Sequence, residues 1–153
     1  MSKAEKAREL FMEGANCAQA VFGAFAQECG ISEEQAFIMS SGFGGGVGRL
    51  REVCGAVSGM VMVLNMIYGS ADLKDKTAKD AQYARIQQVA EEFRKECGSI
   101  VCRELLGLTP GHKDTPVSEE RNAGYYKKRP CADMVALAAE ITERFIDQES
   151  ACR

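Results

Sequence analysis

Cysteines are the residues of this chain whose number and spacing suggest chemistry. There are seven, which are Cys17, Cys29, Cys54, Cys97, Cys102, Cys131 and Cys152. In a reducing compartment structural disulfides are rare, so this excess indicates metal binding, an iron–sulfur cluster or thiol redox chemistry. No two of them are spaced as Cys-x-x-Cys, so zinc ribbons and thioredoxin-like motifs are not indicated. The competing interpretation is that each cysteine is a small apolar core residue.

Four of the seven cysteines fall where a helix is expected to begin. These four are Cys17, Cys54, Cys102 and Cys131. Asn16, Ser99 and Pro130 precede three of them and suit helix starts, and a glycine-rich segment precedes the fourth. The first turn of a helix has free N–H groups and the positive end of the dipole, so it stabilises a thiolate. If the helix starts converge, the four cysteines form one catalytic or metal-binding site.

The glycine-rich segment GFGGGVG at residues 42–48 resembles a phosphate-binding loop only in composition. It contains neither the Gly-Lys-Ser/Thr of a P-loop nor Gly-x-Gly-x-x-Gly after a strand. Gly44, Gly45 and Gly46 leave the backbone uncovered and allow positive φ angles. We therefore expect these glycines to bring backbone amides close to the cysteine sulfurs and to contribute to cofactor binding.

The remaining candidates have weaker support. Cys97 lies on an apolar helix stripe and is expected in the core, with a substitute role as metal ligand if another cysteine is not used. Cys29 is expected to be structural. Cys152 is expected to be exposed and to have no functional role. His112 is the only histidine and is expected to be a solvated loop residue. Positive charge near the cysteines, at Arg49, Arg51, Arg103 and residues 127–129, would favour thiolates.

The elements that must position these residues are helices. Apolar residues recur at helical spacing along most of the chain, and no segment alternates as a strand does. We expect an all-α bundle of about six helices in one domain over residues 1–153, with an irregular loop or lid at 109–129. Helices are expected near residues 4–11, 17–28, 32–41, 50–68, 77–97, 99–107 and from 130 onward.

Composition narrows the class of protein. The chain has 153 residues, a formal net charge of −3 and a pI near 5.3, which argue against general binding of nucleic acid or anionic membranes. The apolar stretch at 53–68 is short and mixed, so we expect a core helix and no membrane insertion. The charged N-terminus is not a signal peptide, which predicts a cytoplasmic protein. An apolar helix face would allow a homodimer.

Several short motifs together resemble a known family. They are NCAQAV around Cys17, the glycine run, CGAVSG at 54–59, VCRELLG around Cys102 and PCADMV around Cys131. This set resembles the C-GCAxxG-C-C family of putative redox-active proteins, whose four characteristic cysteines would be Cys17, Cys54, Cys102 and Cys131. That family in turn resembles the iron–sulfur domain of split-Soret cytochromes. The chain has no Cys-x-x-Cys-His, so covalent c-type haem is not expected.

Three functions remain open for the four thiols. They could hold an iron–sulfur cluster, which would make the protein an electron carrier or oxidoreductase. Two of them could cycle between dithiol and disulfide with a redox partner protein or a small thiol. A structural zinc–thiolate site, or simply buried core cysteines, is the alternative without redox activity. Four ligands from distant segments favour the cluster slightly over thiol exchange.

Overall fold

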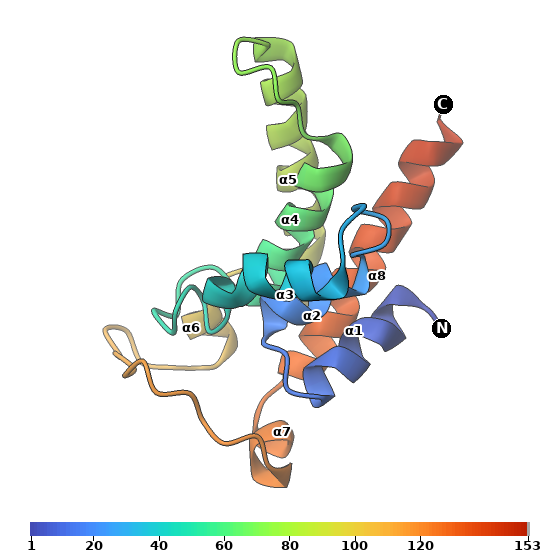
Figure 1. The fold of residues 1–153 in the computed structure, drawn as a ribbon. Helices are drawn as coiled ribbons and strands as arrows, with labels where there is room; N and C mark the ends of the chain where they lie inside the picture. Colours follow the sequence, from blue (N-terminus) through green and yellow to red (C-terminus); the bar gives the residue numbers. More distant parts are fainter. Residues whose placement is uncertain (153) are drawn as a thin grey trace.

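The fold is built from α-helices arranged around a central short helix (Figure 1). The computed structural model describes residues 1–152, and these contain no strand beyond an isolated bridge between Val53 and Val101. The helices are α1 (Lys3–Met12), α2 (Cys17–Ala24), α3 (Glu33–Ser40), α4 (Gly55–Tyr68), α5 (Lys76–Cys97), α6 (Cys102–Leu105), α7 (Ala123–Lys128) and α8 (Cys131–Ala151), with a 3₁₀ turn η1 at Ser41–Phe43. The predicted all-α class is confirmed, with two short helices beyond the six longer ones.

The three short N-terminal helices begin at capping boxes. Ser2, Asn16 and Ser32 each accept a hydrogen bond from the backbone of the residue three positions later, whose side chain bonds back to the cap. This reciprocal pairing satisfies two otherwise free donors at each helix start. Asn16 thereby fixes the residue after it, Cys17, as the first residue of α2.

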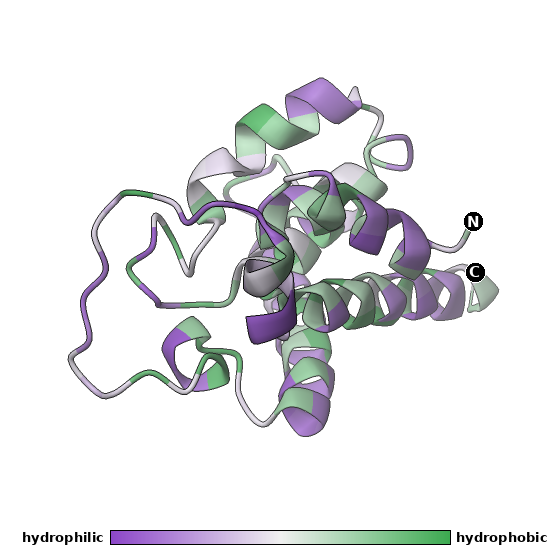
Figure 2. Cartoon of the chain, turned by 90° about the horizontal axis from the view of Figure 1, so that it is seen from below, coloured by the Kyte–Doolittle hydropathy of each residue, from purple (hydrophilic) through white to green (hydrophobic). Residues whose placement is uncertain are grey.

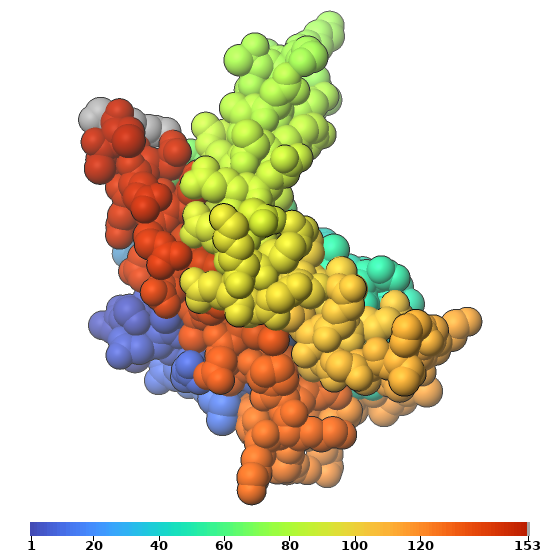
Figure 3. Space-filling view, turned by 180° about the vertical axis from the view of Figure 1, so that it is seen from behind, coloured from blue at the N-terminus to red at the C-terminus, as the bar shows by residue number. Residues whose placement is uncertain are grey.

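The core surrounds α2, which packs against α1, α3, α4 and α8. The largest fully buried side chains include Phe11, Phe22, Phe25 and Phe93. Figure 2 shows the mixture of apolar and polar residues along α8, as expected of an amphipathic helix with one buried face. α4 and α5 form a hairpin that projects away from the C-terminal end of α8 (Figures 1 and 3). Within residues 1–152, no helix combines the length and apolar character needed to cross a bilayer.

Two helix starts differ from the expected ones. The segment 50–68 is helical only from Gly55, because residues 45–49 form turns with left-handed backbone and Arg51 is left-handed too. The helix expected from Ser99 begins at Cys102, since the Ser99 hydroxyl accepts from Val101 N in a local turn instead of capping a helix. As a result, Cys54 is the N-cap of α4 and Cys102 is the first residue of α6, whereas both were expected a few residues after the helix start. The segment 109–129 is irregular up to residue 122 and then forms α7.

Gly59 allows α2 and α4 to approach closely, which gives a stability prediction. A Cβ atom at Gly59 would lie 2.7 Å from Val21 Cβ and 3.1 Å from the Ala18 carbonyl oxygen, both parts of a packed core. For Gly59→Ala we expect the overpacking cost of about 1–3 kcal/mol to outweigh a gain of about 1 kcal/mol in helix propensity. Urea unfolding should therefore show a lower midpoint than the wild type.

Ser58→Ala is the matched control, because it changes helix propensity at the neighbouring, half-buried position of α4. It should leave the midpoint nearly unchanged. A Gly59→Ala protein as stable as this control would contradict the close packing of the two helices.

Candidate functional site

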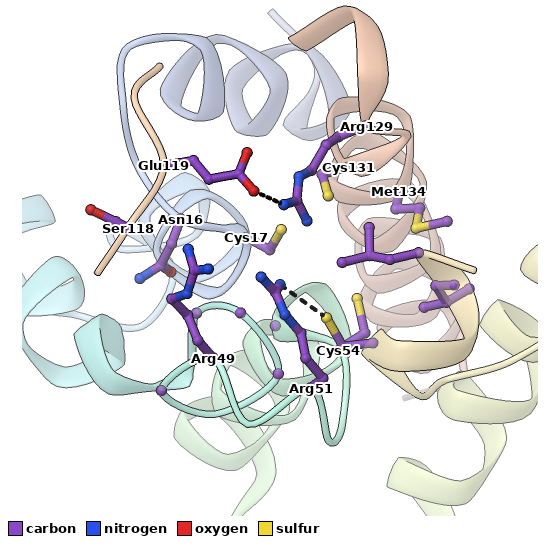
Figure 4. Close-up of a pocket in the computed structure, with 18 of the residues that line it drawn as sticks. Asn16, Cys17, Arg49, Arg51, Cys54, Ser118, Glu119, Arg129, Cys131 and Met134 are labelled. Atoms are coloured by element: carbon purple, nitrogen blue, oxygen red, sulfur yellow. Dashed lines mark hydrogen bonds and ion pairs between the residues drawn. The ribbon is translucent and has the colours of Figure 1, made fainter. Parts of the chain in front are cut away.

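The starts of four helices meet around one cavity of about 350 Å³ (Figure 4). A cysteine stands at each start: Cys17, Cys102 and Cys131 are the first residues of α2, α6 and α8, and Cys54 is the N-cap of α4. All four line the cavity. The structure thus brings together the four residues that the sequence analysis selected, while their chemical roles remain predictions.

Cys17 and Cys131 interact, and their pKa values shift in opposite directions. Their hydrogen bond is the largest cause that lowers the pKa of Cys131 to about 7 and raises the pKa of Cys17 well above its ordinary value. Burial opposes the lowering at Cys131, whereas the positive charges of Arg129, Arg121 and Arg51 add to it. Cys131 is therefore the more acidic thiol of the pair, and interaction with Cys17 favours its ionised form.

Cys54 and Cys102 are held side by side by backbone pairing. Cys54 N donates to Ile100 O at 2.8 Å, Cys102 N donates to Glu52 O at 2.6 Å, and the bridge between Val53 and Val101 lies between these bonds. Both side chains are buried, in contrast to the half-buried Cys17 and Cys131. The pairing of 51–54 with 100–103 is too short to give a strand pattern, so the sequence offered no signal for it.

From their positions at helix starts, all four cavity cysteines were expected to have lowered pKa values. This is not the case for every one of them. Burial raises the pKa of Cys54 to about 12, although the first-turn amides of Ala56 and Val57 act in the opposite direction. Burial also raises the pKa of Cys102, against the lowering effect of Arg51. The expectation was wrong for these two, because removal from water costs a thiolate more than the helix terminus returns. It was also wrong for Cys17, whose pKa is raised first by the hydrogen bond with Cys131 and then by burial.

Arg51 connects the cysteine cavity to an ion-pair network. Its Nη1 donates to Cys102 Sγ at 3.7 Å and its Nε donates to Asp114 Oδ2 at 2.6 Å. Arg49 Nη2 lies 3.4 Å from Asp114 Oδ1, and His112 Nε2 lies 3.1 Å from the same oxygen. Arg51 and then His112 lower the pKa of Asp114 to about 2. His112 thus lies in a loop, as expected, but it is half-buried and bonded to Asp114 instead of fully solvated.

The glycine-rich loop winds in a left-handed path along the cavity wall. Gly45, Gly46 and Gly48 have positive φ angles, and so do three residues with side chains, Val47, Arg49 and Arg51. Each such non-glycine residue costs roughly 1–2 kcal/mol, a strain that is typical of functional sites. The loop places Gly44, Gly45 and Gly46 on the lining, as well as the two arginines.

Gly46 makes the closest approach to a cysteine, which gives a second prediction. A Cβ at Gly46 would lie 2.6 Å from Cys102 Cβ and 2.7 Å from Glu52 N. Gly46→Ala should therefore displace Cys102 as well as strain the backbone at its φ of +69°. We expect a loss of roughly 2 kcal/mol or more in the free energy of unfolding, together with faster alkylation of Cys102, measured by mass spectrometry of its peptide.

Gly48→Ala is the matched control in the same loop. Gly48 also has a positive φ of +56°, but a Cβ there would meet nothing within 4 Å. This variant should cost only about 1 kcal/mol of backbone strain and leave the alkylation of Cys102 unchanged. Equal effects at the two glycines would contradict the close contact at Gly46.

The segment between α6 and α8 covers one side of the cavity. Glu119, Arg121, Tyr125 and Arg129 line it, and Arg129 Nη2 lies 2.5 Å from Glu119 Oε1. The Arg121 guanidinium lies 4.6 Å from the centre of the Tyr125 ring. Sequence analysis missed Glu119 and Arg121, since nothing in an irregular stretch indicates which side chains turn inward.

The other cysteines do not reach the cavity. Cys97, the candidate substitute ligand, ends α5 and packs against the hydrophobic core, and Cys29 also packs there. Cys152 is exposed. In the part of the chain that the structure describes, no three His, Cys, Asp or Glu side chains are arranged as they would be around a metal ion.

Comparison with known proteins identifies the family. No curated protein and no solved structure matches this chain. A family model described as "Putative redox-active protein (C_GCAxxG_C_C)" matches residues 15–145, a span that contains all four cavity cysteines and the glycine-rich loop. Since the match covers most of the chain, the protein belongs to this C_GCAxxG_C_C family, which is described as putative redox-active.

Proposed function

We propose that the protein is a dithiol–disulfide redox protein whose reacting pair is Cys131 and Cys17. The observation that carries this proposal is the direct interaction of the two thiols in a cavity shared by all four helix-start cysteines. Thiol exchange requires an attacking thiolate and a nearby resolving thiol. Cys131, with its lowered pKa, and Cys17, which interacts with it, suit these two roles.

The chemistry assigns different roles to the two cysteines. The Cys131 thiolate attacks one sulfur of a disulfide, forms a mixed disulfide and releases a thiolate. Cys17 then attacks the Cys131 sulfur, which closes the Cys17–Cys131 disulfide and releases a second thiol that takes the Cys17 proton. The protein loses two electrons in this sequence and the substrate disulfide gains them. A reducing thiol returns the protein to its dithiol form by the reverse steps.

The surroundings favour this division of roles. Arg129, Arg121 and Arg51 stabilise the negative charge on Cys131. In the first turn of α8, which is 21 residues long, free amides add to that effect. Cys17 interacts with Cys131 and lines the same cavity, so a resolving thiol is available to the attacking one.

An iron–sulfur cluster is the second candidate. Its supporting observation is that four thiols from four helices line the same cavity, which is the number of ligands that common clusters use. Such a cluster would supply one-electron transfer, and Cys17, Cys54, Cys102 and Cys131 would hold it. Against it, no three of these residues have metal-binding geometry among residues 1–152. We therefore place the dithiol function first.

One anaerobic preparation tests these functions together. The purified protein is analysed for iron, zinc and acid-labile sulfide, and part of it is oxidised with hydroxyethyl disulfide. We expect metal-free, colourless protein that loses two mass units and yields a peptide linking Cys17 to Cys131. Iron with acid-labile sulfide would favour the cluster instead, and stoichiometric zinc with unreactive thiols would overturn both redox functions.

A further inference from the structure

The wall of the cysteine cavity is rich in arginine. Four guanidinium groups line it, those of Arg49, Arg51, Arg121 and Arg129. The negative groups around them are Glu119 on the wall, Asp114 just behind it, and the Cys131 thiolate. Positive charge therefore exceeds negative charge at this site, whereas the whole chain has a net charge of −3.

Two of these arginines retain unused hydrogen-bonding capacity. The Nε–H groups of Arg49 and Arg129 are buried and have no acceptor among the described residues. Buried donors usually have a partner. Figure 4 shows Arg49, Arg51 and Arg129 around the space next to Cys17 and Cys131. Arginine binds carboxylates with paired hydrogen bonds, and four arginines on one cavity wall suit a ligand that carries carboxylates.

Each guanidinium is also held in position. Arg51 is only 5% exposed and is bonded to Asp114 and Cys102. Arg121 donates to the Phe11 and Ala15 carbonyl oxygens at 3.3 and 3.2 Å and stacks on Tyr125. Arg129 is paired with Glu119. Groups fixed before a ligand arrives lose little conformational entropy on binding, which favours affinity for a small anion.

We propose that the cavity selects a small disulfide that carries carboxylates. This inference rests on the proposed dithiol function and names its substrate class. The acid groups bind the arginines, and this binding presents the disulfide sulfur to the Cys131 thiolate. The reaction is R–S–S–R plus the protein dithiol, giving two R–SH and the Cys17–Cys131 disulfide, with two electrons passing to the substrate. A thiolate without positive groups around it reacts slowly with an anionic disulfide, because like charges repel. In this cavity the arginines reverse the order, so the anionic disulfide reacts faster than a neutral one.

Three disulfides of similar size and different charge test the inference. They are dithiodipropionate, with two carboxylates, neutral hydroxyethyl disulfide, and cystamine, with two ammonium groups. The oxidation rate of the reduced protein is measured with each disulfide. It is then divided by the rate at which the same disulfide oxidises a small neutral thiol, which corrects for the intrinsic reactivity of the disulfide. We expect the normalised rate for the anionic probe to exceed that of the neutral probe roughly tenfold or more at low salt. Cystamine should be slowest, and salt should reduce the differences.

Arg49→Gln should reduce the ratio of the anionic to the neutral rate severalfold, because Arg49 lines the cavity and is not among the largest causes of the pKa shift of Cys131. Arg8→Gln is the matched control, since Arg8 pairs with Asp133 on the exposed surface. It should leave the ratio unchanged. Equal normalised rates for all three probes, or faster reaction of cystamine, would overturn the inference while leaving the dithiol function in place. If no probe oxidises the protein, the proposed function itself fails.

Discussion

Replacing Cys131 with serine is expected to slow reaction with disulfides by roughly 10³-fold or more, because the thiolate is the nucleophile and a serine hydroxyl is not ionised. In the wild type, alkylation of Cys131 by iodoacetamide should be half-maximal near pH 7, the pKa of this thiol, and level off about two pH units higher. For a thiol with the ordinary value of 9.0, the half-maximal rate would be reached only near pH 9. Peptide mass spectrometry at each pH measures the rate at Cys131 separately from the other cysteines.

The groups that face Cys131 determine this profile. They are Cys17, Arg129, Arg121, Arg51, Cys54, Cys102 and Tyr125. Cys17→Ala removes the largest stabilising contribution, the hydrogen bond to the thiolate, so the midpoint should move to higher pH. This variant should also stop at the mixed disulfide, since its resolving thiol is gone.

Cys152→Ser is the control for the loss of a cysteine outside the cavity, because Cys152 is exposed at the end of the chain. It should retain the wild-type profile and rate. If Cys131→Ser still reacted at the wild-type rate, and the reacting residue were Cys54 or Cys102, the assignment of the nucleophile would be wrong.

The sequence predicted the helical class well, because local signals determine it. The capping pattern Ser32–Gln35, the closing glycines and the 3.6-residue spacing each depend only on neighbouring residues. The same signals place Cys17 and Cys131 at helix starts, next to Asn16 and Pro130. They fail where backbone conformation depends on distant contacts. The left-handed path through Val47, Arg49 and Arg51 is one example, because residues with side chains rarely adopt it.

Protonation states also could not be derived from position alone. Cys54 and Cys131 both stand at helix starts, yet burial raises the pKa of Cys54 to about 12 while hydrogen bonding from Cys17 lowers that of Cys131 to about 7. The difference arises from tertiary neighbours that lie far away in the sequence. In the same way, Arg51 was expected only to add charge, whereas its contacts join Cys102 to Asp114, 12 residues further along the chain.

Replacing Asp114 with asparagine is expected to lower the free energy of unfolding by about 3 kcal/mol, because it leaves the buried Arg51 without its charged partner. Arg51 is 5% exposed, and its Nε donates to Asp114 Oδ2 at 2.6 Å. Arg49 loses the same partner. Urea unfolding near neutral pH measures the change. Asp133→Asn removes a carboxylate from an Arg–Asp pair at the exposed surface and should cost less than about 1 kcal/mol.

The pH dependence distinguishes the lost ion pair from a local packing defect. The pKa of Asp114 is lowered from 3.8 to about 2 in the folded protein, so its ionised form stabilises the fold above about pH 4. That contribution is lost as the pH falls toward 2, where the carboxyl becomes protonated in the folded state too. The stability difference between wild type and Asp114→Asn should therefore shrink between pH 4 and pH 2. A difference that stayed constant over this range would mean that the carboxylate charge is not what holds Arg51, and with it Cys102, against the cavity.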